Sequence, residues 1–541
     1  MDNAQIADRL EAFAALLDLA EANPYTARAY RRAAETIRGA ALPVAQLVRT
    51  GQARSLRGIG PGIEARLREL VETGEIAELT ELERELSPDL IGLGRYLGLG
   101  TKRALELARA LGVHTAEELR EAAAAGRLRT ASGIGPKTEA RLLEALGKER
   151  GPRPRQGLLL NRALELSRGI AAALEGEVAG DVRRWGDSCE RLAVVCPAAD
   201  PEPLLTRFDT LPQIVALLER AHSRAVGVTI EGVPIELVVA EPGRFGTALL
   251  RATGSAAYVA ALEPLPDAPD EPAVYDALGV PWCPPELREQ PFAGVPPALI
   301  GLGEIRGDLH CHTTWSDGRA GVEEMGHAAR ERGYDYVAIC DHTPAVGAVR
   351  GLTADDLRRQ GEEIAAANER LAPFRILRGV ECDILADGRL DLPDDVLAEL
   401  DWVQASVHGG QRMSRREMTR RVEEAVRNPH VRCLSHPTGR YINRRPENAL
   451  DLERIFAVAR DQGVALEVNG LPDRLDLSGD HVREALAAGV QIVCSTDAHS
   501  LRGLANMTLS VATARRGWAT SAHVLNTQPL EVLQRGRRAG S

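Results

Sequence analysis

The C-terminal half of the chain alternates short apolar runs with amphipathic segments, and this alternation constrains the fold more than any other feature. Helical periodicity is clear at 322–333 and 451–463. The apolar, strand-like runs around such segments are 336–340, 375–381, 402–408, 432–436, 465–469 and 491–497. Strands that are separated by helical crossovers pair in parallel, so the pattern predicts a parallel α/β barrel. In such a barrel the functional side chains gather at the C-terminal ends of the strands.

Residue types that bind metals stand at the ends of these runs. His310 and His312 alternate along a predicted strand, so both imidazoles can reach one ion while Cys311 points away. Ten of the twelve histidines lie after position 300, which argues against random scatter, although one alone, such as His436, is as easily an ordinary core residue. Imidazole and carboxylate ligands suit zinc and manganese, and nine ligands suffice for two or three ions. The nine candidates are His310, His312, Asp317, His342, Glu381, His408, His436, Asp497 and His499.

Glycine-rich turns occur three times in the N-terminal part, and each leads into a helical segment. One is the stretch 58–62, and related turns lie within 97–109 and 132–146. Such a turn presents backbone N–H groups at a helix N-terminus, where a DNA phosphate is favoured. A single copy is as easily a simple turn, but three copies predict DNA binding that is independent of base sequence. The candidate DNA-binding residues are Gly58, Gly60, Gly62, Gly98, Gly100, Lys102, Gly133, Gly135 and Lys137.

The composition of the chain limits how many domains it can form and which classes of protein it can belong to. A chain of 541 residues with 44% hydrophobic and 26% charged residues predicts three or four globular domains. No uncharged apolar run is long enough to span a bilayer, and the acidic N-terminal segment 1–21 indicates an amphipathic helix instead of a signal peptide. The eight cysteines lack CxxC spacing, so buried reduced thiols and a cytoplasmic location are expected. The net charge of -11 does not exclude local basic surfaces.

Several stretches of the C-terminal half resemble, in order, the polymerase and histidinol phosphatase (PHP) domain. They are 308–343, 379–385, 405–410, 435–440, 466–477 and 494–500. The closing stretch 514–527 and the upstream organisation resemble the bacterial family X DNA polymerases that carry this domain at their C-terminus. The resemblance implies a multidomain α/β protein with helical helix-hairpin-helix N-terminal domains, an α+β nucleotidyltransferase-like palm and thumb, and a distorted (β/α)7 barrel of PHP type.

The resemblance also implies domain boundaries. They are 1–90 for a helical domain with a helix-hairpin-helix, 91–152 for a fingers-like helix-hairpin-helix domain, 158–245 for the palm, 246–292 for the thumb, 293–304 for a linker and 305–541 for the PHP phosphoesterase domain.

By the same resemblance the C-terminal domain is a hydrolase with three divalent metal ions, manganese or zinc. The implied ligand sets are His310, His312, Glu381 and Asp497 for one ion, Glu381, His408 and His436 for a second, and Asp317, His342 and His499 for the third. The implied reaction is phosphoester hydrolysis, as a manganese-stimulated 3'-5' exonuclease of base excision repair with abasic-site endonuclease and 3'-phosphatase activities. Arg440, Arg444 and Arg474 lie just beyond strand ends, where they could clamp phosphate oxygens or could equally be solvated surface residues.

The palm departs from the family pattern at its catalytic acids. The family shows Ala-Gly-Ser-x-Arg-Arg followed by Gly-Asp-x-Asp, and here Asp181 replaces the serine while Arg191 and Ala193 stand at the two aspartates. The third aspartate is replaced by Glu236. Arginine and alanine cannot hold the ions of two-metal phosphoryl transfer, so we expect polymerase activity to be lost.

One way of restoring that chemistry and one further activity of the family are disfavoured. A shifted register would recruit Asp187 and Glu190, but residues three apart on a strand face opposite sides. The lyase reaction of some family members needs a lysine in the first domain, and no lysine precedes Lys102. Arginine cannot replace lysine as the amine nucleophile, so lyase activity is expected to be absent.

Three other functions remain open at this stage. They are an active gap-filling family X polymerase with 3'-5' exonuclease activity, a small-molecule phosphatase of the histidinol phosphate type, and a DNA-binding scaffold without enzymatic activity. The three glycine-rich turns disfavour the small-molecule phosphatase, and the complete set of metal ligands disfavours the scaffold without enzymatic activity. The expected partner is DNA, at 3' ends and at gapped or abasic sites, bound by a monomer that does not associate with membranes.

Overall fold

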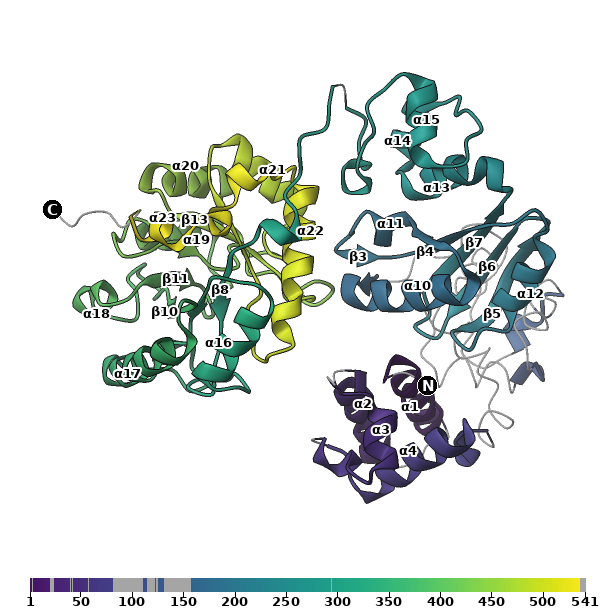
Figure 1. Ribbon diagram of the computed structural model, residues 1–541, viewed down its shortest axis with the longest axis horizontal. Helices are drawn as coiled ribbons and strands as arrows, with labels where there is room; N and C mark the ends of the chain where they lie inside the picture. The colour runs from purple at the N-terminus through teal and green to yellow at the C-terminus, as the bar shows by residue number, and fades with distance from the viewer. Residues whose placement is uncertain are drawn as a thin grey trace.

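The protein folds into three bodies that follow one another along the chain (Figure 1). The computed structural model describes residues 1, 3–19, 24–38, 40, 42–56, 58–80, 110–113, 122, 125–130, 157–292 and 294–535. The N-terminal body is helical, the central body is built on a mixed sheet, and the C-terminal body is a parallel barrel. This architecture confirms the predicted fold class.

The N-terminal body is a group of short helices around one apolar cluster. Its longer helices are α1 (Asn3–Leu19), α2 (Pro24–Arg38), α3 (Val44–Arg49) and α4 (Pro61–Thr73). Phe13 and Tyr30 meet edge to face in the cluster, with 4.8 Å between ring centroids. The first glycine turn leads into α4 as predicted, because Gly58 has a φ of +86° that favours glycine and Pro61 stands at the first position of the helix. The remaining DNA-binding candidates lie outside the described residues; they are Gly98, Gly100, Lys102, Gly133, Gly135 and Lys137.

The central body is a five-stranded sheet with helices on both faces. Its strands are β2 (Glu177–Ala179), β4 (Leu192–Pro197), β5 (Ile214–Ala221), β6 (Arg224–Thr229) and β7 (Pro234–Ala240), in the order β2-β4-β7-β6-β5. β4 and β7 run parallel, and the other neighbours are antiparallel. The helices are α10 (Leu160–Leu174), α11 (Gly180–Arg183), α12 (Glu202–Asp209), α13 (Phe245–Thr253), α14 (Ala256–Leu262) and α15 (Glu271–Leu278). Leu164 of α10 and Phe208 of α12 pack on one face and Leu249 of α13 on the other. Two short strands, β1 (Leu158–Leu159) and β3 (Ser188–Cys189), form a separate antiparallel pair.

The C-terminal body is a nearly closed barrel of seven parallel strands. The strands are β8 (Gly307–Cys311), β9 (Tyr336–Ile339), β10 (Arg375–Asp383), β11 (Trp402–Ser406), β12 (Cys433–Leu434), β13 (Ala465–Asn469) and β14 (Ile492–Ser495). They lie side by side in chain order, and a bridge between Cys311 and Ala498 joins the two edges. The helices are α16 (Val322–Glu331), α17 (Ala354–Leu371), α18 (Asp394–Ala398), α19 (Arg415–Val426), α20 (Leu452–Gln462), α21 (Gly479–Ala487), α22 (Met507–Arg516) and α23 (Leu530–Arg535). The predicted alternation of strands and helices therefore produces the predicted barrel.

A register shift in β8 aims the first predicted ligand into the barrel. β8 pairs with β9 through Asp308 and Cys311, and the pairing is irregular between them. Leu309 packs in the interior apolar cluster, while the next residue, His310, hydrogen-bonds the buried Glu467 of β13. Successive residues of a regular strand face opposite sides, so the irregularity is what allows both to face inward. Cys311 lies in the outer cluster, turned away from the histidines.

Charged side chains tie the N-terminal body to the central one. Arg162 of α10 donates a hydrogen bond of 2.8 Å to Asp8 of α1, and Arg38 of α2 lies 3.2 Å from Glu165 of α10. These groups are largely shielded from solvent, so the pairs are screened less than surface pairs are. Across the described ranges, none of the helices combines the length and apolar character that crossing a bilayer requires.

Candidate metal centre

The nine predicted ligand side chains meet at the C-terminal end of the barrel. They come from the ends of β8, β9, β10, β11, β12 and β14 and from the loop after β8, because parallel strands bring all their carboxyl ends to one side. Most of these side chains are buried, and the more exposed ones are His499 at 33% and Asp317 at 25%. The site is thus an enclosed cluster with one side open to solvent.

Glu381 lies at the centre of the cluster. Its Oε1 is 2.8 Å from Nε2 of His436 and 3.3 Å from Nε2 of His408. Its Oε2 is 3.0 Å from Nδ1 of His342 and 3.4 Å from Nε2 of His310. A single carboxylate that faces four imidazoles from four strands is placed to share its two oxygens between neighbouring ions.

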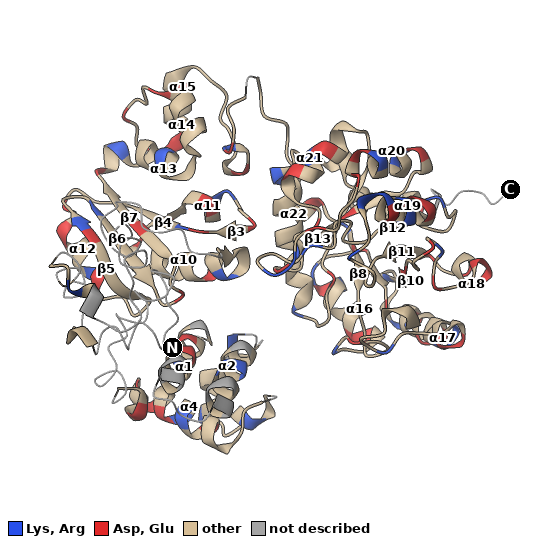
Figure 2. Cartoon of the chain, turned by 180° about the vertical axis from the view of Figure 1, so that it is seen from behind, with Lys and Arg blue, Asp and Glu red and all other residues tan. Residues whose placement is uncertain are grey.

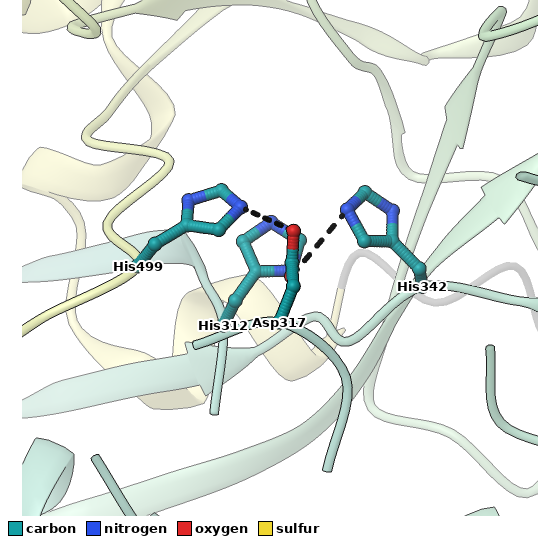
Figure 3. A group of neighbouring side chains, drawn as sticks. All are labelled: His312, Asp317, His342 and His499. Carbon is teal, nitrogen blue, oxygen red and sulfur yellow. Dashed lines mark ion pairs between the residues drawn. The ribbon is translucent and has the colours of Figure 1, made fainter. Parts of the chain in front are cut away.

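A second group forms around Asp317 (Figure 3). Nε2 of His499 lies 3.2 Å from one carboxylate oxygen of Asp317, and Nε2 of His342 lies 3.7 Å from the other. The His312 ring stacks against both imidazoles, with centroids 4.2 Å and 4.5 Å away. Three overlapping groups of possible ligands result in the described part of the chain: His312 with Asp317, His342 and His499; His310 with His312 and Asp497; and His342 with Glu381 and His408.

Two buried carboxylates outside the predicted set orient the histidines. Oε1 of Glu467 lies 2.6 Å from Nδ1 of His310, and Oδ2 of Asp383 lies 3.1 Å from Nδ1 of His408. A carboxylate on the far nitrogen fixes the orientation of a ligating imidazole and raises its basicity. Sequence reasoning missed both residues. The available signal was an acid on the inward face of an apolar strand, at Glu467, and an acid two residues after Glu381, at Asp383.

The charges within the cluster set the protonation of its members. Burial raises the pKa of Glu381, but the surrounding imidazoles, His408 first, outweigh this and hold its pKa well below the ordinary value. Burial lowers the pKa of His408, yet Glu381 and Asp383 raise it to about 10. Burial and two neighbouring histidines lower the pKa of His312 to about 4. Without bound ions, His408 therefore holds a proton while His312 is neutral, and a divalent cation that binds here must displace the proton of His408 because its ligands have to be deprotonated.

Two further observations fit a group of divalent ions. Nδ1 of His312 and Nδ1 of His436 are buried and, among the residues that the structure describes, find no hydrogen-bond partner. Buried polar atoms without partners are costly unless a ligand engages them. His436 and Asp497 have left-handed backbones with φ of +26° and +51°, a conformation that is costly for such residues and that clusters at functional sites. The residues present therefore fit bound cations.

The three arginines expected to clamp phosphate lie in different surroundings, and the side chain of Arg444 is 74% exposed, with its Nη1 3.7 Å from Oδ2 of Asp473. Arg474 is 6% exposed, and its Nε lies 4.0 Å from Oδ2 of Asp497. Its Nε and Nη1 have no hydrogen-bond partner within the described ranges. Arg440 instead donates from Nε and Nη2 to the carbonyls of Arg474 and Leu475 and to Asp187 of the central body. Arg474 thus borders the ligand cluster, whereas Arg440 joins the barrel to the central body.

The central sheet places two of the positions predicted to correspond to the family's acids side by side, and one of the two carries a carboxylate. Ala193 of β4 pairs in register with Glu236 of β7. Arg224 forms an ion pair with Glu236, and Nη1 of Arg191 lies 3.8 Å from Oε2 of the same side chain. Two guanidinium groups therefore lie where bound metal ions would need negative charge.

Two other nearby acids, Asp181 and Asp187, are also paired with arginines. Asp181 forms an ion pair with Arg184 at the end of α11. Asp187, which a shifted register would recruit, pairs with Arg440 and Arg516 of the barrel. Each carboxylate is neutralised by a fixed cation, which competes with a divalent ion for its oxygens.

Three protein-family models match the chain. A model described as a helix-hairpin-helix domain matches residues 1–76, and one described as a SAM-like helix-hairpin-helix tandem matches residues 89–148. A model described as the PHP domain matches residues 308–470, which include the barrel strands from β8 to β13. These matches agree with the glycine turns and the ligand pattern found in the sequence.

Known proteins similar to the chain include a relative of nearly the same length and shorter relatives that match its C-terminal part. The DNA polymerase/3'-5' exonuclease PolX of Bacillus subtilis (strain 168) is 34% identical over 560 residues, which cover 97% of this chain and 97% of the relative. A probable phosphatase of Acetivibrio thermocellus is 32% identical over 202 residues, covering 36% of this chain and 78% of the relative. A probable phosphatase of Caldicellulosiruptor bescii is 30% identical over 203 residues, which cover 36% of this chain and 79% of the relative. The similarity to the first relative therefore extends over almost the full length of both chains.

Proposed function

Since the chain belongs to the bacterial family X DNA polymerases of the PolX type, with helix-hairpin-helix domains and a C-terminal PHP domain, we propose that its principal activity is metal-dependent hydrolysis of DNA from the 3' end. The Bacillus subtilis relative is named both a DNA polymerase and a 3'-5' exonuclease. Of these two activities, we propose that this protein retains the exonuclease and has lost the polymerase.

The observation that carries the proposal is the contrast between the two sites. In the barrel, nine histidine and carboxylate side chains converge around Glu381 and Asp317. In the palm, Ala193 and Arg191 stand where carboxylates would be needed, and Glu236 is held by arginines. Two-metal chemistry needs several carboxylates that are free to bind ions, so the barrel supports catalysis better than the palm.

Divalent ions in the barrel, three in number and manganese or zinc on this proposal, would polarise the phosphoryl oxygens and activate a water molecule. The side chains of the protein orient the metal ligands and supply negative charge that balances the charge of the ions. Glu467 and Asp383 fix two imidazole rings, and Glu381 supplies shared negative charge. Arg474 has buried N–H groups that find no hydrogen-bond partner in the described part of the chain, and it is suited to bind a non-bridging phosphate oxygen.

The helix-hairpin-helix domains support DNA as the substrate over a small phosphorylated metabolite. Their glycine turns bind backbone phosphates without reading bases, which suits an enzyme acting on 3' ends and on gapped or abasic DNA. We place this activity in base excision repair, with abasic-site cleavage and 3'-phosphate removal as related reactions of the same site. The similarity to probable phosphatases supports a phosphoester hydrolase of either kind, so DNA must be tested against a small phosphomonoester.

The test is degradation of an oligonucleotide labelled at its 5' end, with manganese and without. We expect a ladder of products shortened from the 3' end, complete loss of degradation on chelation, and slow hydrolysis of histidinol phosphate under the same conditions. Products that remain full-length in manganese, together with rapid hydrolysis of histidinol phosphate, would show a small-molecule phosphatase instead.

Loss of polymerase activity is tested by primer extension. With a gapped template, deoxynucleoside triphosphates and magnesium or manganese, we expect extension at least about 10³-fold slower than by an active family member, because the carboxylates that hold both ions are missing. A variant lacking hydrolysis, such as Glu381→Gln, must be used so that degradation does not mask synthesis. Template-directed incorporation at ordinary enzyme concentrations would contradict the proposal and favour a gap-filling polymerase.

A further inference from the structure

One loop of the barrel lies between the metal centre and the palm. This loop, residues 471–477, is called the arginine loop because it carries Arg474. It follows β13 directly, and the amide of Leu477 donates a 3.0 Å hydrogen bond to the carbonyl of Glu467. The Arg474 guanidinium lies over the Tyr441 ring, 4.3 Å from its centroid, and donates to the Tyr441 hydroxyl at 2.7 Å. The loop thereby fixes an arginine beside the ligand Asp497.

The other side of the arginine loop is embedded in the palm. Leu475, the residue after Arg474, is fully buried in the apolar cluster of the palm that also contains Leu164 and Leu192. Its backbone is left-handed, with a φ of +44°, which is unfavourable for leucine. Packing against the palm offsets this cost, so the shape of the loop depends on a neighbouring domain.

A polar contact from the palm reinforces the apolar one. Asp187 lies between α11 and β3, and its Oδ2 accepts a 2.6 Å hydrogen bond from Arg440 of the barrel. The same Arg440 donates from Nε to the carbonyl of Arg474 at 2.9 Å and from Nη2 to the carbonyl of Leu475. A chain of contacts thus runs from a palm carboxylate, through one guanidinium, to the backbone that carries Arg474. Figure 2 shows a basic loop of the barrel reaching towards β3 of the palm.

We propose that Asp187 is a positioning residue for the hydrolase and that the palm has become a structural part of the metal site. This inference rests on the proposed function and goes beyond it, because it assigns a role to a palm that no longer supports nucleotidyl transfer. Asp187 holds Arg440, and Arg440 holds the backbone of the arginine loop. The loop presents to the substrate phosphate the Nε and Nη1 of Arg474, which have no hydrogen-bond partner among the residues that the structure describes. A phosphate-binding arginine that drifts by about 1 Å loses much of its contribution to catalysis.

The structure supplies a matched control. Arg515 and Arg516 are adjacent at the end of α22, and both pair with acids of the central body. Arg516 pairs with Asp187, which also holds Arg440, whereas Arg515 pairs with Glu286 at 2.7 Å. Glu286→Gln therefore removes an ion pair between the same two bodies without disturbing the contacts that lead to Arg474.

The experiment compares Asp187→Asn and Glu286→Gln in the full-length protein. Hydrogen exchange of the amides in 471–477, followed by mass spectrometry, is expected to accelerate by about 10-fold in Asp187→Asn and to stay unchanged in Glu286→Gln. The kcat/KM for oligonucleotide degradation is expected to fall by about 10-fold in Asp187→Asn alone, and the inhibition constant of inorganic phosphate to rise by a similar factor. The affinity for manganese should be unchanged in both variants.

Specificity of the coupling is tested by a double-mutant cycle. Arg440→Gln should give the same loss of kcat/KM as Asp187→Asn, and the double variant should lose no more than either, because all three break one chain of contacts. Unchanged loop exchange in Asp187→Asn would overturn the inference, as would unchanged kcat/KM in a variant whose loop exchanges faster. If the wild type hydrolyses no phosphoester while the loop still responds to Asp187→Asn, the proposed function fails and the anchoring of the loop by the palm stands.

Discussion

Replacing Glu381 by glutamine is expected to lower kcat/KM for hydrolysis at a DNA 3' end by about 10³-fold or more. Glutamine keeps the size of the side chain but removes the negative charge that faces imidazoles from four strands. A shared ligand affects more than one ion, so excess manganese should restore little activity. The measurement is the rate of oligonucleotide degradation over a range of manganese concentrations.

A buried glutamate elsewhere in the barrel provides the control. Glu423 of α19 is 5% exposed and pairs with Arg454, away from the ligand cluster. Glu423→Gln should therefore retain the wild-type rate, although it also removes a buried carboxylate. His312→Ala should behave like Glu381→Gln, since His312 stands in two of the overlapping ligand groups. Wild-type degradation by both site variants would place catalysis outside this cluster.

Replacing Glu467 by glutamine is expected to weaken manganese binding by about 10-fold to 100-fold, as loss of an outer-sphere carboxylate does in metal sites. Glu467 does not belong to the predicted ligand set. It accepts from Nδ1 of His310 at 2.6 Å, from the hydroxyl of Ser435 at 2.9 Å and from the amide of His436 at 2.5 Å. Glutamine can accept from some of these donors but lacks the negative charge that raises the basicity of the His310 imidazole as a metal ligand.

The dependence of activity on manganese concentration distinguishes Glu467→Gln from Glu381→Gln. For Glu467→Gln, activity should fall at limiting manganese and recover at high manganese, whereas Glu381→Gln should stay inactive at both. Titration calorimetry with manganese alone gives the dissociation constants without relying on catalysis, and circular dichroism checks that the variant is folded. A manganese affinity equal to that of the wild type would show that Glu467 serves the barrel core and not the ions.

The sequence was sufficient for the fold class and for the convergence of the ligand cluster. His342, His408 and His436 each follow an apolar run, and the helical segments between the runs force the strands to be parallel. Parallel strands end on one side, so residues at strand ends must approach one another whatever the details of the packing. The glycine turn before α4 was likewise predictable, because a left-handed glycine followed by proline is a local signal.

The side chains that hydrogen-bond to these residues could not be predicted from the sequence. The contact between His310 and Glu467 joins positions 157 residues apart, and the contact between Arg440 and Asp187 joins positions 253 residues apart. The register shift that turns both Leu309 and His310 inward is also invisible in a pattern that assumes regular alternation.

The sequence by itself therefore indicated which residues could bind metal and predicted a palm without its catalytic acids, because residue types and local periodicity can be read from it directly. Only the tertiary structure decided which carboxylate orients which histidine, and that Asp187 holds Arg440 instead of a metal ion. The physical reason is that local patterns follow from backbone geometry and solvent exposure, whereas the pairing of buried charges depends on how separate elements pack and exclude water.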